Sequence, residues 1–330
     1  MNSIEVDTVL SKFKLKLSDK YPRDSKLYLY ADYFEFVALI NHCEIGDEDM
    51  LDRLRDEDII GRNKSSDGTV NNESSMNTSV NDDDEAFIKS ILKLIEQRAF
   101  LFGDLYPFNY NDERFCIKED LSEHQKLYIF LLVASNLSLF KDCMGNITTE
   151  FEFISEKALQ NYVPNYAIVQ GFGKKSIYKG YAKDKIKALA EAMNVASNEK
   201  FLDSISNKGT QDLGVDIVAW LPFKDNIGNY ITIFAQCACG KDWNKKLSET
   251  SRYNRLITTY LSDINHAIFV PYSLGNYNNS SFFDDYEFGN SIIVFERFRI
   301  LSLLQDNTII GELESKTLID RVIEYQEDIV

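Results

Sequence analysis

Three residues in the second half of this 330-residue chain have types and spacing suited to hydrolysis at a metal ion. Asp216 lies in the apolar run VDIVAWLPF, and Gln236 lies near the end of the next run, YITIFAQCA. Both runs predict β-strands, joined by the turn-rich segment KDNIGN. Lys241 follows the second strand. A carboxylate, an amide oxygen and an ammonium group at one lip of a sheet could hold a divalent cation and stabilise a charged transition state.

The pattern resembles the PD-(D/E)XK nuclease superfamily, in particular its restriction-endonuclease-like branch, which includes Mrr proteins. That branch often begins one strand with Gly-x-Asp and carries Gln-x-Lys in the next. Here Gly214 and Asp216 precede Gln236 in that order. The likeness covers roughly the second half of the chain. It implies an endonuclease that hydrolyses DNA with Mg²⁺ or Mn²⁺, as the nuclease subunit of a restriction or anti-phage defence complex.

The resemblance also assigns roles to single residues. Asp216 would bind the metal through its carboxylate, and Gln236 would add a carbonyl oxygen or position the metal's water. The backbone carbonyl of Cys237 and the carboxylate of Asp212 are further metal-ligand candidates. The superfamily tends to place a glutamate on the helix before the strand pair, and the candidates for that place are Glu191 and Glu152.

One position departs from the family pattern. The lysine belongs two residues after Gln236, on the same face of the strand, but the chain has Ala238 there. Lys241 is the first candidate to supply the ammonium group instead, and Lys246 is the second. The departure also leaves an alternative function open, in which a catalytically degenerate nuclease fold serves as a scaffold or partner-binding subunit.

The elements that must position these residues follow from apolar periodicity. Residues 1–145 predict a mainly helical N-terminal region with a flexible, polar and acidic insertion at 62–85. Residues 146–330 alternate helical and strand patterns and include a long helix at about 243–261. The predicted fold is a mixed α/β (α+β) fold, with a mixed-sheet, restriction-endonuclease-like core in 146–330 preceded by the α-helical region.

The charge balance constrains the partners. The chain has 52 Asp and Glu residues against 36 Lys and Arg, a formal net charge of -16. Binding DNA neutralises phosphates with Lys and Arg, and an acidic surface opposes that at long range. We therefore expect one of two arrangements. Either basic side chains cluster at the DNA-binding site, or a larger DNA-engaging or ATPase subunit supplies most of the affinity for DNA. The sequence also leaves open whether the chain forms a homo-oligomer.

The cysteines and the apolar runs bear on the cellular compartment. Five cysteines are an odd number in a long chain, which favours a reducing environment over a disulfide framework. By strand alternation Cys237 and Cys239 should face the core as free thiols. The longest apolar run, LYIFLLVASNLSLF, is too short to span a bilayer. The sequence predicts a cytoplasmic protein without a membrane segment.

Overall fold

The computed structural model describes residues 3–14, 26–57, 59–60, 73–173, 176–205, 213–259, 262–283, 288, 292–304 and 308–326. Contacts divide the chain into two compact units, unit 1 (Met1–Leu132, Leu274–Phe283 and Lys316–Val330) and unit 2 (Val133–Ser273 and Asp284–Ser315). The chain thus contributes to unit 1 from three separate segments, whereas the sequence predicted a single boundary at 145/146. No helix in the described ranges has both the length and the apolar character of a membrane span.

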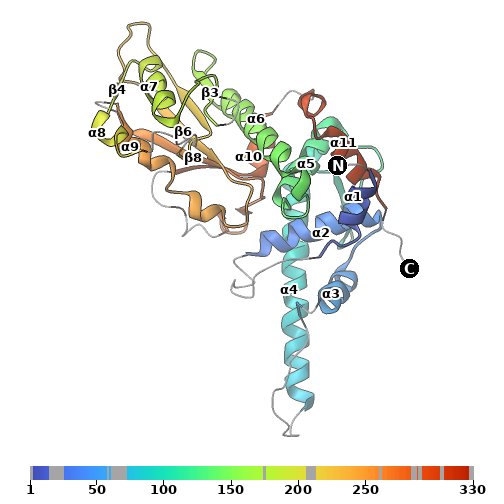
Figure 1. Ribbon diagram of the computed structural model, residues 1–330. Coiled ribbons are helices and arrows are strands. Elements are labelled where there is room, and N and C mark those ends of the chain that lie inside the picture. Colours follow the sequence, from blue (N-terminus) through green and yellow to red (C-terminus); the bar gives the residue numbers. More distant parts are fainter. Residues whose placement is uncertain are drawn as a thin grey trace. The chain divides into compact units, whose positions relative to one another are not determined.

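Unit 1 is mainly helical (Figure 1). Its helices are α1 (Ser3–Leu10), α2 (Leu27–Asn41), α3 (Asp47–Asp56), α4 (Glu73–Phe102), most of α5 (Glu123–Ser135) and α11 (Lys316–Glu324). Two small antiparallel pairs complete it, β1 (Phe108–Asn111) with β2 (Arg114–Ile117) and β9 (Gly275–Asn276) with β10 (Ser281–Phe282). Nearly all side chains of α2 are buried, which explains why apolar residues occur around the whole helix rather than along one stripe.

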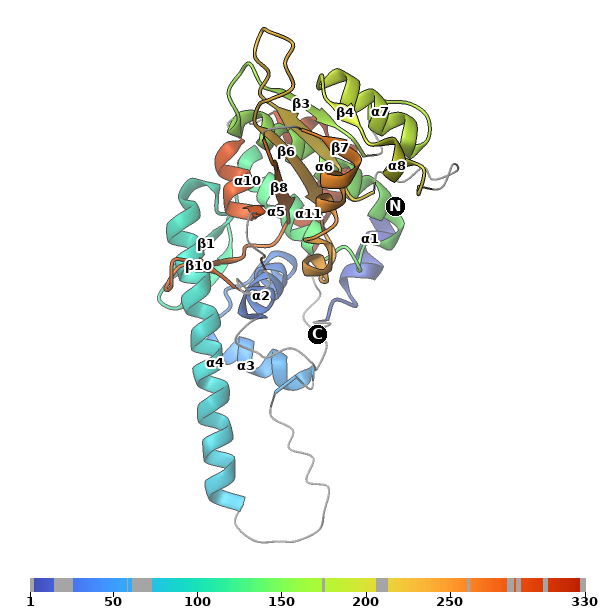
Figure 2. The same ribbon diagram turned by 90° about the vertical axis from the view of Figure 1, so that its left-hand side faces the viewer.

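Helix α4 begins inside the segment where the sequence predicted a flexible insertion. Residues 73–85 form the N-terminal turns of α4, and residues 62–72 lie outside the described residues. Figure 2 shows α4 as one unbroken helix. Its later turns bury side chains such as Ile88 and Ile91. Once those turns are formed, each added residue gains a hydrogen bond without a new nucleation cost, so a polar run can extend the helix.

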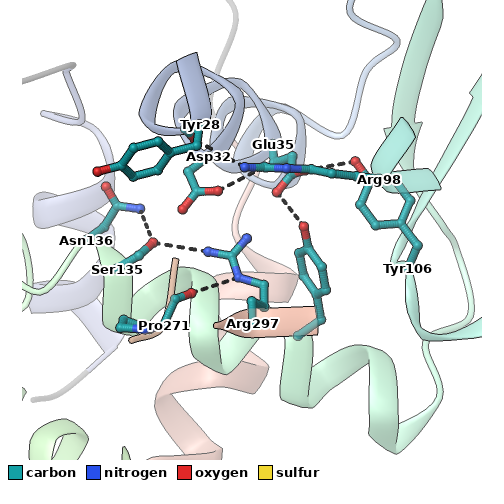
Figure 3. A network of polar contacts seen from close by, with 10 residues as sticks. Tyr28, Asp32, Glu35, Arg98, Tyr106, Ser135, Asn136, Pro271 and Arg297 are labelled. Atoms are coloured by element: carbon teal, nitrogen blue, oxygen red, sulfur yellow. Dashed lines mark hydrogen bonds and ion pairs between the residues drawn. The ribbon is translucent and has the colours of Figure 1, made fainter. Parts of the chain in front are cut away.

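A buried ionic network connects three helices of unit 1 (Figure 3). The Arg98 guanidinium on α4 lies 2.9 Å from Asp32 and 2.8 Å from Glu35, both on α2. Tyr106 and Tyr128 donate hydrogen bonds of 2.9 and 2.7 Å to the two oxygens of Glu35. Burial alone would lower the pKa of Arg98, but the two carboxylates raise it well above its usual value. The network keeps these buried charges paired.

Unit 2 contains, within the described residues, a five-stranded mixed sheet in the order β11-β8-β6-β5-β3. Its strands are β3 (Ile168–Gly171), β5 (Ile217–Trp220), β6 (Thr232–Cys237), β8 (Ile264–Phe269) and β11 (Ile292–Phe295). Strands β3, β5 and β6 pair antiparallel, whereas β6, β8 and β11 pair parallel. Helices combined with this sheet confirm the predicted mixed α/β class.

Helices pack on this sheet in two groups. Helix α6 (Met144–Tyr162) contacts β3, β5, β6 and α10 (Arg297–Leu303). A second group packs onto β5 and β6 through a buried apolar cluster that includes Trp220 and Phe234. It comprises α7 (Ala182–Ala192), α8 (Glu199–Leu202) and α9 (Tyr253–Leu256), beside the short pair β4 (Ala196–Ser197) and β7 (Ile257–Thr258). All four residues of β5 are buried, so its sequence is continuously apolar rather than alternating.

The start of α10 carries two buried charged side chains. Arg297 donates from Nε to Pro271 O at 2.9 Å and from Nη2 to Ser135 Oγ at 3.4 Å (Figure 3). Glu296 caps the helix by accepting the Arg299 N–H at 3.0 Å. Its other oxygen, Oε2, has no hydrogen-bond partner among the described residues. Burial raises the pKa of Glu296.

The long helix predicted at 243–261 does not form in the described part of that segment. The chain instead makes two 3₁₀ turns, η4 (Trp243–Lys246) and η5 (Thr250–Arg252), before the single turn of α9 and strand β7. Hydrogen bonds between residues three apart run through the segment, including Glu249 N to Lys246 O and Arg252 N to Glu249 O. Trp243, at the start of η4, and Tyr253, at the start of α9, are both buried. Packing of these aromatic rings outweighs the helical periodicity of the sequence.

Candidate functional site

The sheet of unit 2 opens at one end into a cavity of about 500 Å³. It lies where β5 begins and β6 ends, because antiparallel pairing sets Ile217 opposite Ala235 and so brings the preceding and following residues together. Helix α6 contributes to the cavity wall, and so does the segment 243–252 after β6, which contains η4 and η5 and is called the 3₁₀ segment below. The charged and amide side chains that line it are Glu152, Asp216, Gln236, Lys246, Glu249 and Arg252.

Asp216 is fixed by both its backbone and its side chain. Its N–H donates to Ala235 O at 2.9 Å, and its carbonyl accepts from Gly173 N at 3.1 Å. Its Oδ2 accepts the backbone N–H of Cys237 at 2.7 Å. These bonds connect the start of β5 with the end of β6 and with the residues after β3, so the Asp216 carboxylate is held where these strands end.

A second carboxylate faces the same point. A Cβ added to Gly173 would lie 2.8 Å from Glu152 Oε2 and 3.3 Å from Asp216 Oδ1. The missing side chain at Gly173 therefore leaves room for both oxygens. Glu152 was one of two glutamates that the sequence offered for this place, and α6 carries it there.

Gln236 supplies an oxygen without a partner. Its side chain is 4% exposed, and its Nε2 donates to Glu249 Oε2 at 2.6 Å. Its Oε1 is buried and accepts no hydrogen bond from any described residue. A buried amide oxygen left in this state costs free energy unless a ligand or water pairs with it.

The 3₁₀ segment presents three charged side chains to the cavity. Lys246, Glu249 and Arg252 are spaced three apart, and 3₁₀ winding of about three residues per turn places such residues in line. Glu249 and Arg252 were not predicted from the sequence. The spacing by three would have placed them on the same face as Lys246 only if 3₁₀ geometry had been assumed for this segment.

Two thiols also line the cavity. Cys237 is half-buried, Cys239 is buried, and both are free. Burial raises the pKa of Cys237, and the negative charges of Asp216 and Glu152 add to the effect. Burial likewise raises the pKa of Cys239, against the nearby charge of Lys246. Since β6 ends at Cys237, strand alternation does not decide where Cys239 points.

Two of the predicted site residues, Glu191 and Lys241, are not brought to the cavity. Glu191 is exposed on α7, and Lys241 lies in the turn after β6; neither lines the cavity. Asp212 lies outside the described residues. Lys246, which the sequence ranked second, lines the cavity from the last residue of η4.

The residues present fit a hard divalent cation. Two carboxylates, Asp216 and Glu152, face one point, and the Gln236 oxygen lines the same cavity. Mg²⁺ prefers oxygen ligands and is commonly held by one or two carboxylates together with water. Among the described residues no group of three His, Cys, Asp or Glu side chains is placed to hold a metal, so the amide would complete the oxygen set.

Comparison of the chain with protein-family models, with curated proteins and with solved structures found no match.

Proposed function

We propose that the chain is a Mg²⁺- or Mn²⁺-dependent endonuclease that hydrolyses DNA phosphodiester bonds, with a PD-(D/E)XK, restriction-endonuclease-like core in unit 2. The proposal rests on one observation above all. Asp216, Glu152, Gln236 and Lys246 line one cavity at the junction of β5 and β6, and the Gln236 amide oxygen there has no hydrogen-bond partner among the described residues. The resemblance seen in the sequence supplies the reaction class.

Asp216, Glu152 and the Gln236 amide would hold the metal. The bound cation would lower the pKa of its water and offset phosphate charge. Lys246 would place its ammonium beside the scissile phosphate and stabilise the charge that develops during cleavage. Arg252, six residues after Lys246, lines the same cavity and would bind a neighbouring phosphate.

The plasmid-nicking assay tests the proposal directly. Purified protein should nick supercoiled DNA when Mg²⁺ or Mn²⁺ is added, and Asp216→Ala should abolish nicking. Asp263→Ala, which removes an exposed carboxylate of the same unit, should nick like the parent. Equal cleavage by the parent and by Asp216→Ala would rule the assignment out.

A degenerate scaffold is the second candidate, and Ala238 favours it. The chain has alanine where the family pattern has its lysine, and this alanine is fully buried. Calorimetry with Mn²⁺ separates the two candidates. A scaffold should show no uptake that depends on Asp216, whereas a nuclease should bind the ion and lose it in Asp216→Ala.

The biological setting of the proposal comes from the resemblance and from the charge. A restriction or anti-phage defence role accompanies the family likeness. The net charge of -16 fits a nuclease that works beside a larger DNA-engaging or ATPase subunit. None of the five cysteines is in a disulfide, which agrees with the proposed cytoplasmic location.

A further inference from the structure

The Gln236 amide is held in one of its two orientations. A carboxylate only accepts hydrogen bonds, so the amide must turn its NH₂ group toward Glu249. The observed bond, Gln236 Nε2 to Glu249 Oε2 at 2.6 Å, satisfies that requirement. The amide oxygen then faces away from Glu249, and it is the atom left without a partner among the described residues.

Glu249 is itself held in place by the surrounding backbone. Gly214 has a positive φ of +88°, and a Cβ there would lie 2.5 Å from Glu249 Cβ and 2.9 Å from Glu249 Oε2. A side chain at this position would push Glu249 away from the amide. The hydrogen bond from Glu249 N to Lys246 O, 3.0 Å long, in turn fixes the backbone from which the Glu249 side chain extends.

We infer that Glu249 is a positioning residue that acts through Gln236 by aiming the amide oxygen into the cavity as a ligand oxygen for the cation. The inference rests on the proposed function and extends it. It also gives a reason for glutamine at position 236. A glutamate there would set two carboxylates within hydrogen-bonding distance of each other, which is unfavourable unless a proton or a cation intervenes.

Mn²⁺ titration of the full chain tests the positioning role. Glu249→Ala should weaken Mn²⁺ binding about tenfold, in the range found when outer partners of metal ligands are removed. Glu249→Gln keeps an acceptor oxygen and should lose less. At saturating Mn²⁺ both variants should recover most of the parent's cleavage rate, since the metal can then fix the amide. Glu191→Ala, an exposed helix acid, should match the parent throughout.

A charge exchange tests the pair itself without any metal. In the presence of chelator at neutral pH, Gln236→Glu should lower the unfolding temperature by several degrees. Gln236→Glu combined with Glu249→Gln restores one carboxylate facing one amide, and should return it to within about a degree of the parent. If the exchange brings no recovery, the pairing is wrong.

The two measurements separate the possible failures. If the parent binds Mn²⁺ and Glu249→Ala binds it equally well, the positioning role fails while the proposed nuclease stands. If the parent takes up no Mn²⁺, both the proposed function and the positioning role fail. Recovery of the unfolding temperature in the charge exchange would then still show that Gln236 and Glu249 pair.

Discussion

Lys241 and Lys246 compete for one chemical role, and their positions separate them. Lys246 lines the cavity with both carboxylates, whereas Lys241 does not. We expect Lys246→Ala to reduce the cleavage rate by about 10²- to 10³-fold, the usual effect of removing one preorganised group that stabilises transition-state charge. Single-turnover cleavage at saturating metal measures it.

Two neighbouring lysines serve as controls for that measurement. Lys245 is exposed and pairs with Asp242 at 3.1 Å, so Lys245→Ala should cleave like the parent. Lys241→Ala should remain within a few-fold of the parent. A large loss in Lys241→Ala with none in Lys246→Ala would restore the ranking drawn from the sequence.

Glu296 offers a pH-dependent test of burial at a single residue. Burial raises its pKa, so the folded protein holds this proton more tightly than the unfolded chain does. Its contribution to stability is therefore complete at low pH and is lost as the pH rises through the raised pKa. Glu296→Gln keeps the capping oxygen without the charge, and should therefore make the protein more stable than the parent at neutral pH, where the buried Glu296 carboxylate is charged.

Thermal unfolding followed by circular dichroism across the pH range checks this expectation. The advantage of Glu296→Gln over the parent should shrink as the solution is made mildly acidic, because the parent then binds the proton and becomes neutral as well. Glu191→Gln, at an exposed site, should show no such trend. A difference that stays constant with pH would contradict the assigned cause.

At the scale of elements, the strands were predictable and the 3₁₀ segment was not. The runs VDIVAWLPF and YITIFAQCA are continuous apolar stretches bounded by turn residues, and they form β5 and β6 as adjacent antiparallel strands. That pairing is why Asp216 and Gln236 could be read as neighbours from the sequence. The 243–261 segment has helical periodicity, yet burial of Trp243 and Tyr253, a tertiary effect, determines its path.

The same tertiary effect hid part of the site. An α-helix turns about 100° per residue, so residues three apart drift by about 60° around the axis at each step. Lys246, Glu249 and Arg252 would spread over a broad arc in an α-helix. In the folded chain, hydrogen bonds from Glu249 N to Lys246 O and from Arg252 N to Glu249 O link residues three apart, and all three side chains line the cavity.

The aligned 3₁₀ segment predicts a specific role for Arg252 in DNA binding. In an Asp216→Ala background, which should prevent cleavage, Arg252→Ala should weaken DNA binding several-fold. It should also reduce the slope of log affinity against log salt by about one, because one phosphate contact is lost. Fluorescence anisotropy at several salt concentrations measures both. Arg255→Ala removes an exposed arginine of α9 that does not line the cavity, and should leave both quantities unchanged.

At the scale of the whole molecule, the order of the chain does not follow the division into units. The last helix, α11, belongs to unit 1 together with α1 and α2. The chain between Leu132 and Lys316, however, belongs mostly to unit 2. Local patterns predict the elements but carry no signal for such long-range pairing, which is why the sequence assigned 146–330 to one domain. Deleting residues 1–145 would therefore leave segments of unit 1 behind and remove the first residues of unit 2.

Truncation after Ser315 tests this assignment, because it removes α11 and nothing of unit 2. Helix α11 buries Leu318, Ile319 and Val322, and each such side chain contributes roughly 1.5–3 kcal/mol. Its Arg321 also pairs with Asp7 of α1 at 2.5 Å.

For the truncated chain we expect unit 1 to lose several kcal/mol of stability, seen as an unfolding transition at lower temperature, while Mn²⁺ uptake that depends on Asp216 persists. Loss of that uptake at a temperature where the truncated chain keeps its helical signal would show that α11 supports unit 2 instead. Arg321→Ala, which removes only the partly exposed ion pair, should lower the stability by less than about 1 kcal/mol. This variant therefore separates the burial of the apolar side chains from the charge contact.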